Sequence, residues 1–311
     1  MAYGVPYKGS KNAIAEQIVD LLPSASTLYD VFAGGCAISH CALLKQRFQH
    51  HVLVDSTDIP QVFLKAWRGE PIPVDWVSRA EYFKRYKHDP LLKAMWSFGN
   101  KPGHYIYGVD IEPYKYAIHS LAVKGQFLMM HVLFPNACED IWKAVCHMPL
   151  SNIRARRLAI SCALSKACVE GKLPPGCPIK GRRDAAVENL ERLSRLQSIY
   201  NGAVYGKASL EFWQIDYREA EFTDPAGVIY CDPPYKGTDK YDSNFNHEAF
   251  YDWCERQVLP VYISEYDMPS ERFECIAAFD KTCCVCATDT THVVEKLWRP
   301  RCLPKELYGN I

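Results

Sequence analysis

The chain has 311 residues, of which 48% are hydrophobic and 13% aromatic, and its 36 basic residues balance its 36 acidic ones. This length is enough for one large or two modest domains, and a net charge of zero argues against a generally polycationic protein. No apolar stretch is long enough to cross a bilayer, and residues 1–12 lack the apolar core of a secretory signal. We therefore expect a cytoplasmic globular protein without a membrane segment.

The fourteen cysteines do not provide two Cys-x-x-Cys motifs, so we expect reduced thiols. The densest group is Cys283, Cys284 and Cys286, in a stretch that reads as a β-strand. Adjacent side chains on a strand point to opposite faces, which is poor geometry for zinc. We expect these cysteines to act as small buried hydrophobes, and we expect no metal.

The first sixty residues predict an α/β unit, with a helix over 13–22, a strand over 27–32, a glycine turn, a helix over 37–48 and a strand over 51–54. Ahead of them, residues 6–11 offer an aromatic face at Tyr7 and a cation at Lys11, a pattern that is common in surface loops. The glycine turn contains Gly34 and Gly35, which allow a ligand to approach the backbone closely.

Asp55 ends the second predicted strand, where a carboxylate can accept hydrogen bonds from ribose hydroxyls. The three-glycine dinucleotide fingerprint is absent, and no phosphate-binding loop ending in Gly-Lys-Ser/Thr follows a strand. The pattern therefore disfavours nucleotide hydrolysis. An exposed acid at a strand end is the alternative interpretation of Asp55.

From 59 to 202 the sequence has helical periodicity broken by loops rich in glycine and proline, which predicts a largely helical insertion. Residues 151–200 hold ten Lys/Arg against four Asp/Glu, whereas residues 211–280 hold five against sixteen. A basic segment in an otherwise acidic chain is a candidate surface for nucleic-acid phosphates, and a solvated helical face is the alternative. The candidate phosphate contacts are Arg154, Arg156, Arg157, Lys180, Arg182 and Arg183.

After residue 203 strands return at 209–215, 228–231 and 261–264, followed by a β-hairpin that we expect to turn at 288–291. Asp216 and Tyr217 follow the first of these strands, at a tip where such sheets bind ligands.

The most informative motif, Asp232-Pro233-Pro234-Tyr235, follows the apolar run 227–231. Each proline fixes φ near −65° and removes a backbone donor, so carbonyls face the site without competing N–H groups. Asp232 and the carbonyl of Pro233 can accept hydrogens from the exocyclic NH₂ of a base while Tyr235 stacks on its ring. A simple turn after a buried strand is the alternative.

In order along the chain, these parts resemble the Dam-like D12 class of DNA adenine-N6 methyltransferases, which use S-adenosylmethionine. The resemblance covers 4–58 and 205–300. Tyr7 and Lys11 look like the family's aromatic-x-Gly-x-Lys motif for the methionine end of the cofactor. Asp55 resembles its ribose acid, Asp216 its adenine-contacting acid, and 232–235 its catalytic motif. The cofactor-binding residues that the resemblance implies are Tyr7, Lys11, Asp30, Phe32, Ala33, Gly34, Gly35, Cys36, Asp55, Asp216 and Tyr217.

The resemblance implies a doubly wound, mostly parallel seven-stranded α/β sheet with a C-terminal β-hairpin and an inserted helical domain. We expect the catalytic domain at 1–58 and 203–311 and the DNA target-recognition domain at 59–202. The implied reaction transfers the methyl group of S-adenosylmethionine to N6 of an adenine flipped out of double-stranded DNA and leaves S-adenosylhomocysteine. No metal and no obligate protein partner is implied.

Two positions depart from the family pattern. Cys36 stands where the family usually has a second glycine, and Pro6 stands where the GATC-specific members have a lysine. Their Phe-Asn-Val-Pro hairpin is also not recognisable, so we do not expect GATC specificity. Phe98, Asn100 and Tyr105 are the candidates for an intercalating wedge and an adenine-reading amide, and an ordinary aromatic loop is the alternative. A methyltransferase of the same fold acting on RNA or protein, or a non-catalytic DNA-binding relative, remain alternatives for the whole chain.

Overall fold

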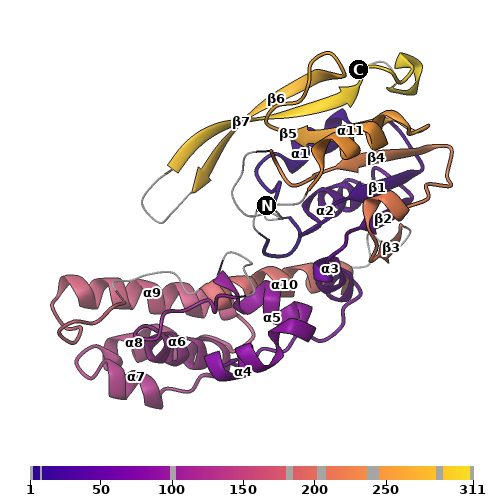
Figure 1. Cartoon of the computed structure of the whole chain (residues 1–311). Coiled ribbons are helices and arrows are strands. Elements are labelled where there is room, and N and C mark those ends of the chain that lie inside the picture. The colour runs from indigo at the N-terminus through magenta and orange to yellow at the C-terminus, as the bar shows by residue number, and fades with distance from the viewer. Residues whose placement is uncertain are drawn as a thin grey trace. The chain divides into compact units, whose positions relative to one another are not determined.

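A computed structural model of the chain describes residues 3–7, 9–98, 103–179, 185–201, 208–236, 245–284 and 290–308. The chain forms two compact units (Figure 1). Unit 1 comprises residues 1–5, 9–67 and 199–311, and unit 2 comprises residues 6–8 and 68–198. No helix within the described ranges combines the length and apolarity needed to cross a membrane.

Unit 1 is built on a seven-stranded sheet in the order β3-β2-β1-β4-β5-β7-β6. Its strands are β1 (Thr27–Val31), β2 (His50–Val54), β3 (Ser209–Trp213), β4 (Gly227–Cys231), β5 (Val261–Glu265), β6 (Phe273–Cys284) and β7 (Thr290–Pro300). The first five strands pair in parallel, and β7 pairs antiparallel with both β5 and β6. The expected mostly parallel sheet with a C-terminal hairpin is therefore confirmed.

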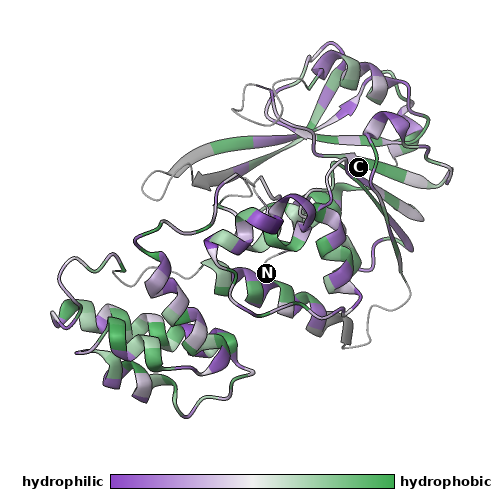
Figure 2. Ribbon diagram, turned by 60° about the horizontal axis from the view of Figure 1, so that its bottom comes forward, coloured by the Kyte–Doolittle hydropathy of each residue, from purple (hydrophilic) through white to green (hydrophobic). Residues whose placement is uncertain are grey.

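The central strands are apolar because helices cover both faces of such a sheet. Every residue of β1, β4 and β5 is buried, and Figure 2 shows green, apolar stretches along the strands. The helices of unit 1 are α1 (Ala15–Leu21), α2 (Ala37–Leu44), α3 (Ile59–Trp67) and α11 (His247–Glu255), with short 3₁₀ turns η3 (Tyr217–Glu219) and η4 (Lys305–Tyr308). Helix α3 belongs to this unit because Phe63 packs against His40 of α2, with ring centroids 5.6 Å apart.

Unit 2 is helical. It contains α4 (Arg79–Arg85), η1 (Tyr86–His88), α5 (Pro90–Trp96), α6 (Glu112–Lys124), α7 (Leu128–Leu133), α8 (Cys138–Val145), α9 (Ile153–Val169) and most of α10 (Ala185–Asn201). Aromatic rings form part of its core. Trp96 is buried, and its ring stacks on that of Tyr105 at an interplanar angle of 3°.

Some element ends differ from the sequence prediction. The helix predicted over 37–48 ends at Leu44, and Gln46 then adopts a left-handed φ of 53°, which a helix cannot contain. The turn predicted at 288–291 lies partly outside the described residues, while Thr290 and Thr291 belong to β7, opposite Cys284 and Cys283 of β6.

Candidate functional site

The candidate motifs meet where β1, β2 and β4 end. Val31 of β1 pairs with both Val54 of β2 and Cys231 of β4. The next residues of the three strands, Phe32, Asp55 and Asp232, therefore leave the sheet at the same edge. Chain order runs outward from β1 in one direction and from β4 in the other, so this edge is a topological switch point, where open α/β sheets bind ligands.

The glycine turn after β1 has an unusual backbone. Phe32, Gly34 and Cys36 have φ values of 61°, 47° and 57°, a region that L-residues rarely enter. Cys36 is the N-cap residue of α2, so the position that departs from the family pattern is one where glycine is unstrained. The thiol of Cys36 is buried and donates to the Gly34 carbonyl, so the side chain that replaces the family's glycine points into the protein interior.

Asp55 holds this turn in place. Its Oδ2 accepts a hydrogen bond from the Gly34 amide at 2.8 Å, and its Oδ1 accepts from the amide and the hydroxyl of Thr57, both at 2.7 Å. Burial raises the pKa of Asp55, and these hydrogen bonds oppose that shift. The carboxylate is thus fixed at the strand tip, although part of its accepting capacity is already used by the loop.

The N-terminal segment packs against the same turn. The Val5 amide donates to the Gly35 carbonyl at 2.8 Å, and the Gly4 amide donates to Nδ1 of His40 at 2.8 Å. A Cβ on Gly4 would lie 2.0 Å from the Gly35 oxygen, so only glycine permits this approach.

Lys11 lies at the centre of a charged cluster. Its Nζ forms a short ion pair with Oδ1 of Asp232 and lies 3.4 Å from Oε1 of Glu295. It also lies 4.8 Å from the ring centroid of Tyr235, whose hydroxyl donates to Oε1 of Glu295 at 2.6 Å. Lys11 is 4% exposed and Glu295 0%, whereas Asp232 is 22% exposed. The structure therefore brings Lys11, Asp232 and Tyr235 together, and of the three charged side chains in the cluster Asp232 is the most exposed.

Electrostatics in the cluster favour charged Lys11 and neutral Tyr235. Burial lowers the pKa of Lys11, but the charges of Asp232 and Glu295 outweigh it and the net shift is upward. Burial and the same two carboxylates raise the pKa of Tyr235 well above its usual value. Tyr235 thus remains a hydrogen-bond donor to Glu295.

Asp30, expected among the cofactor-binding residues, instead supports α2. It is buried in β1, and its Oδ2 accepts from the hydroxyl of Ser39 at 2.6 Å and from the Ser39 amide at 3.2 Å. Those donors belong to the first turn of α2, where backbone N–H groups lack partners within the helix. Burial raises the pKa of Asp30 to about 7.

Asp216 and Tyr217 follow β3 with different surroundings. Oδ1 and Oδ2 of Asp216 accept from the guanidinium of Arg218 at 2.8 and 2.9 Å, and Oδ1 also caps the η3 turn. Tyr217 is buried and its ring lies 5.1 Å from that of Phe32, so the glycine turn and η3 share an aromatic contact. Asp216 must therefore exchange or share its Arg218 partner to bind a ligand amine.

Four residues around the motif at 232–235 were not predicted from the sequence. His247 Nε2 lies 3.0 Å from the Pro234 carbonyl, and the ring of Tyr266 meets Tyr235 edge to face at 4.7 Å. Glu265 accepts from the amides of Tyr266 and Lys236 at 2.8 and 3.2 Å, and Glu295 accepts from Tyr235 as described above. The signal for Glu295 was present: it occupies an inward position of an alternating strand, two residues before buried Leu297.

Glu265 gives the stability of the protein a specific pH dependence. Burial raises its pKa from 4.5 to about 7, against the two backbone hydrogen bonds that it accepts. Because the folded state holds the proton more tightly, this group makes the protein less stable as the pH rises from about 4.5 to about 7, by up to about 3 kcal/mol. We expect Glu265→Gln to remove that slope. Urea unfolding of both proteins across this pH range measures it, and parallel curves would contradict the assignment.

Apart from Arg156 and Arg157, the candidate DNA contacts in unit 2 divide into three groups. Phe98 is 68% exposed and Arg154 is exposed, so both remain available to a partner. Tyr105 is buried and its hydroxyl donates to the Val77 carbonyl at 2.6 Å, so it is a core residue and not a wedge. Asn100, Lys180, Arg182 and Arg183 lie outside the described residues.

Two of the candidate arginines are structural. Arg156 is buried, and its guanidinium donates at 2.6–3.0 Å to the carbonyls of Leu121, Ala122, Val145 and Met148. Arg157 pairs with Glu191 at 2.6 Å and with Glu188 at 3.1 Å. The prediction that Arg156 and Arg157 contact phosphates is wrong. The number of basic residues in a segment does not show which arginines form hydrogen bonds and ion pairs between helices.

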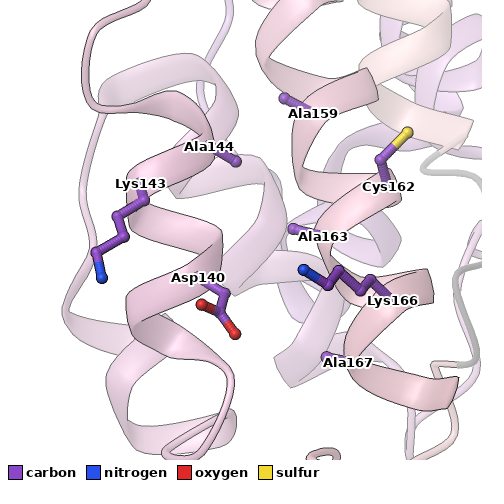
Figure 3. Close-up of a pocket in the computed structure, with 8 residues that line it drawn as sticks. All are labelled: Asp140, Lys143, Ala144, Ala159, Cys162, Ala163, Lys166 and Ala167. Carbon is purple, nitrogen blue, oxygen red and sulfur yellow. The ribbon is translucent and has the colours of Figure 1, made fainter. Parts of the chain in front are cut away.

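Unit 2 also contains a groove of about 530 Å³ between α8 and α9. Figure 3 shows Ala159, Ala163 and Ala167 on α9 directed toward α8, with Asp140 and Lys166 beside them. None of the motif residues lines it, so it is not part of the candidate site. A search of the described residues finds no group of three or more His, Cys, Asp or Glu side chains arranged to hold a metal ion.

Residues 7–107 match the model of the D12 class N6 adenine-specific DNA methyltransferase family. No curated protein matches the sequence. The matched region includes Tyr7, Lys11, the glycine turn and Asp55, and it ends before Asp216 and the motif at 232–235. The expected family resemblance is therefore confirmed for the first third of the chain. The pairing of β1 with β4 brings the motif at 232–235, which follows β4, beside this matched region.

Proposed function

Because the chain belongs, through residues 7–107, to the D12 class N6 adenine-specific DNA methyltransferase family, we propose that the ends of β1, β2 and β4 bind S-adenosylmethionine and that Asp232 and Tyr235 hold the target adenine. Family membership makes the chain an S-adenosylmethionine-dependent, adenine-specific DNA methyltransferase. The residue assignment rests on the register of β1 with β2 and β4, which brings Phe32, Asp55 and Asp232 to one edge of the sheet.

The residues at this edge fit the cofactor chemically. Its carboxylate requires a cation, which Lys11 supplies, and its ribose hydroxyls require an acceptor, which Asp55 supplies. Ser10 Oγ, next to Lys11, is buried without a hydrogen-bond partner within the described part of the chain, as expected of a group that a ligand completes. We assign Asp216, sharing its oxygens with Arg218, as the acceptor for the adenine amine of the cofactor, and the contact between Phe32 and Tyr217 as an adjoining wall.

We expect replacement of Asp55 to weaken cofactor binding. Asp55→Asn removes the charge and keeps an oxygen for the Gly34 amide, while its amide nitrogen replaces the oxygen that accepts from Thr57, so the loss reports on the ribose hydrogen bonds together with the loop that holds the acid. Affinity for S-adenosylmethionine should fall about tenfold or more, the usual effect of losing hydrogen bonds to a charged group. Isothermal titration calorimetry measures it, with Asp20→Asn on the exposed end of α1 as the control. Equal affinities in the two variants would exclude Asp55 from the cofactor site.

The chain's own residues then position the target amine. The cofactor, once bound, supplies an electrophilic methyl group. Asp232 accepts one hydrogen of the adenine N6 amine and the Pro233 carbonyl accepts the other, which directs the nitrogen lone pair at the methyl carbon. No hydrogen bond within the described ranges uses the Pro233 carbonyl, whereas that of Pro234 is held by His247. Tyr235 stacks on a base that has left the duplex.

Unit 2 is the proposed target-recognition domain for double-stranded DNA. Phe98 is retained as an exposed aromatic candidate and Arg154 as a phosphate contact, together with Asn100, Lys180, Arg182 and Arg183. The family match favours DNA over RNA or protein as the substrate.

For this surface we expect the pair Arg182→Ala and Arg183→Ala to weaken binding to any duplex. Each lost phosphate contact should reduce the slope of log affinity against log salt by about 0.9. The control removes two cations that acidic neighbours already neutralise, Lys143 (paired with Glu139 at 2.6 Å) and Lys166 (paired with Glu170 at 3.7 Å). If both double variants give the wild-type slope, Arg182 and Arg183 are solvated surface residues.

A further inference from the structure

We propose that Glu295 on β7 is a positioning residue for methyl transfer, acting through Tyr235 and Lys11. The inference rests on the proposed function, since it assumes that Asp232 and Tyr235 hold the adenine. Neither the family match, which ends at residue 107, nor the sequence motifs assign any role to β7.

Glu295 is a costly residue at its position. It is fully buried between an exposed Val294 and a partly buried Lys296, on the same side of β7 as buried Leu297. A buried carboxylate loses its hydration, and replacing a buried ion pair with well-packed apolar residues is often neutral or stabilising. Apolar residues in place of the whole cluster, Lys11 and Glu295 together, would therefore serve the sheet at least as well, so stability alone does not explain a carboxylate at this position.

Glu295 contacts two residues of the candidate site through one atom. One oxygen, Oε1, accepts from the Tyr235 hydroxyl at 2.6 Å and lies 3.4 Å from Lys11 Nζ. Lys11 in turn forms the ion pair with Asp232. A single atom on β7 is thus linked to both side chains that are proposed to hold the base, one directly and one through a lysine.

Glu295 also constrains the orientation of the Tyr235 ring. The Tyr235 ring is held at its hydroxyl by Glu295 and at its face or edge by Tyr266, at an interplanar angle of 79°. The plane of a stacked base follows the plane of the ring beneath it. Fixing the Tyr235 ring therefore fixes the orientation of the adenine amine relative to Asp232, and small misplacements of reacting groups are costly in rate.

The test compares Glu295→Gln, Tyr235→Phe and the double variant. Gln keeps an oxygen acceptor of the same size but loses the charge, and Phe removes only the hydroxyl. We expect each single variant to lower the single-turnover rate of DNA methylation about tenfold to a hundredfold, while the affinity for S-adenosylmethionine changes less than about threefold. Because both act on the same hydrogen bond, one by removing the charge of the acceptor and the other by removing the donor, the double variant should be no slower than the slower single variant by more than about threefold.

Glu274→Gln is the matched control, since Glu274 lies on the same hairpin and pairs with Arg299 at 2.9 Å. A rate for Glu295→Gln equal to that of Glu274→Gln, with only the melting temperature lowered, would assign Glu295 a purely structural role. Multiplicative effects in the double variant would also overturn the proposal.

Two further outcomes are distinguishable. If Glu295→Gln does not fold, Tyr235→Phe alone decides, because a wild-type rate would show that the hydrogen bond to Glu295 has no part in transfer. If the wild-type protein itself methylates no adenine in DNA, the proposed function fails, which is a different result from an active wild type with an unaffected Glu295 variant.

Discussion

Asp232→Ala protein should bind S-adenosylmethionine within about threefold of the wild-type affinity and transfer no measurable methyl group to DNA. The carboxylate takes no part in the hydrogen bonds that Asp55 makes with the glycine turn, and Lys11 keeps Glu295 as a partner after Asp232 is removed, so we expect the cofactor side of the site to stay intact. Its loss removes the acceptor that directs the N6 lone pair, and correct alignment of reacting groups contributes about 7 kcal/mol or more to such reactions. We expect the single-turnover rate to fall by at least about a thousandfold.

The matched control for this variant is Asp224→Ala, just before the opposite end of β4. Asp224 accepts hydrogen bonds from Thr27 at 2.6 Å and from the Ala226 amide at 2.9 Å, so its removal costs stability without touching the motif. Tritium transfer from labelled cofactor to duplex DNA measures the rate, and calorimetry measures the affinity. Near-normal transfer by Asp232→Ala would remove Asp232 from the mechanism.

Lys11→Met should destabilise the fold by about 3–5 kcal/mol, which is the usual effect of removing one partner from a buried ion pair. Lys11 is 4% exposed, and its removal leaves the carboxylates of Asp232 and Glu295 facing each other without their cation. Methionine keeps most of the apolar stem, so the loss reports on the charge. Cofactor affinity should fall as well, because the carboxylate of S-adenosylmethionine loses its proposed partner.

An exposed lysine provides the comparison. Lys45 pairs with Asp20 at 2.6 Å, with side chains 30% and 60% exposed, and such pairs contribute at most about 1 kcal/mol. Urea unfolding of Lys45→Met should therefore differ little from wild type. If both variants lose the same stability, the Lys11 cluster is not the electrostatic centre of the site.

The parallel sheet was predictable because its strands carry strong local signals. Continuous apolar runs such as 227–231, each ending in a polar residue, predict buried strands with functional tips, and the register places those tips side by side. The glycine turn and Asp55 were predictable for the same reason, because each directly follows a predicted strand in the sequence.

Partners far apart in the sequence were not predictable. Glu295 and Tyr235 are sixty residues apart, and their hydrogen bond depends on β7 entering the sheet beside β5. The same limit explains the errors in unit 2. In the sequence, Arg156 cannot be distinguished from the other basic residues of its segment. Only the packing of α6, α8 and α9 shows that its guanidinium is surrounded by backbone carbonyls. Nothing in the sequence indicated that Asp30, a strand acid next to a cofactor motif, holds the first turn of α2.

The central claim, that this site methylates N6 of adenine in DNA, is tested most directly by nucleoside mass spectrometry. Unmethylated duplex DNA is incubated with S-adenosylmethionine and either the wild-type or the Asp232→Ala protein, then digested and analysed. We predict N6-methyladenine with the wild type and none with Asp232→Ala. Methylation of cytosine alone, or equal N6-methyladenine from both proteins, would contradict the account.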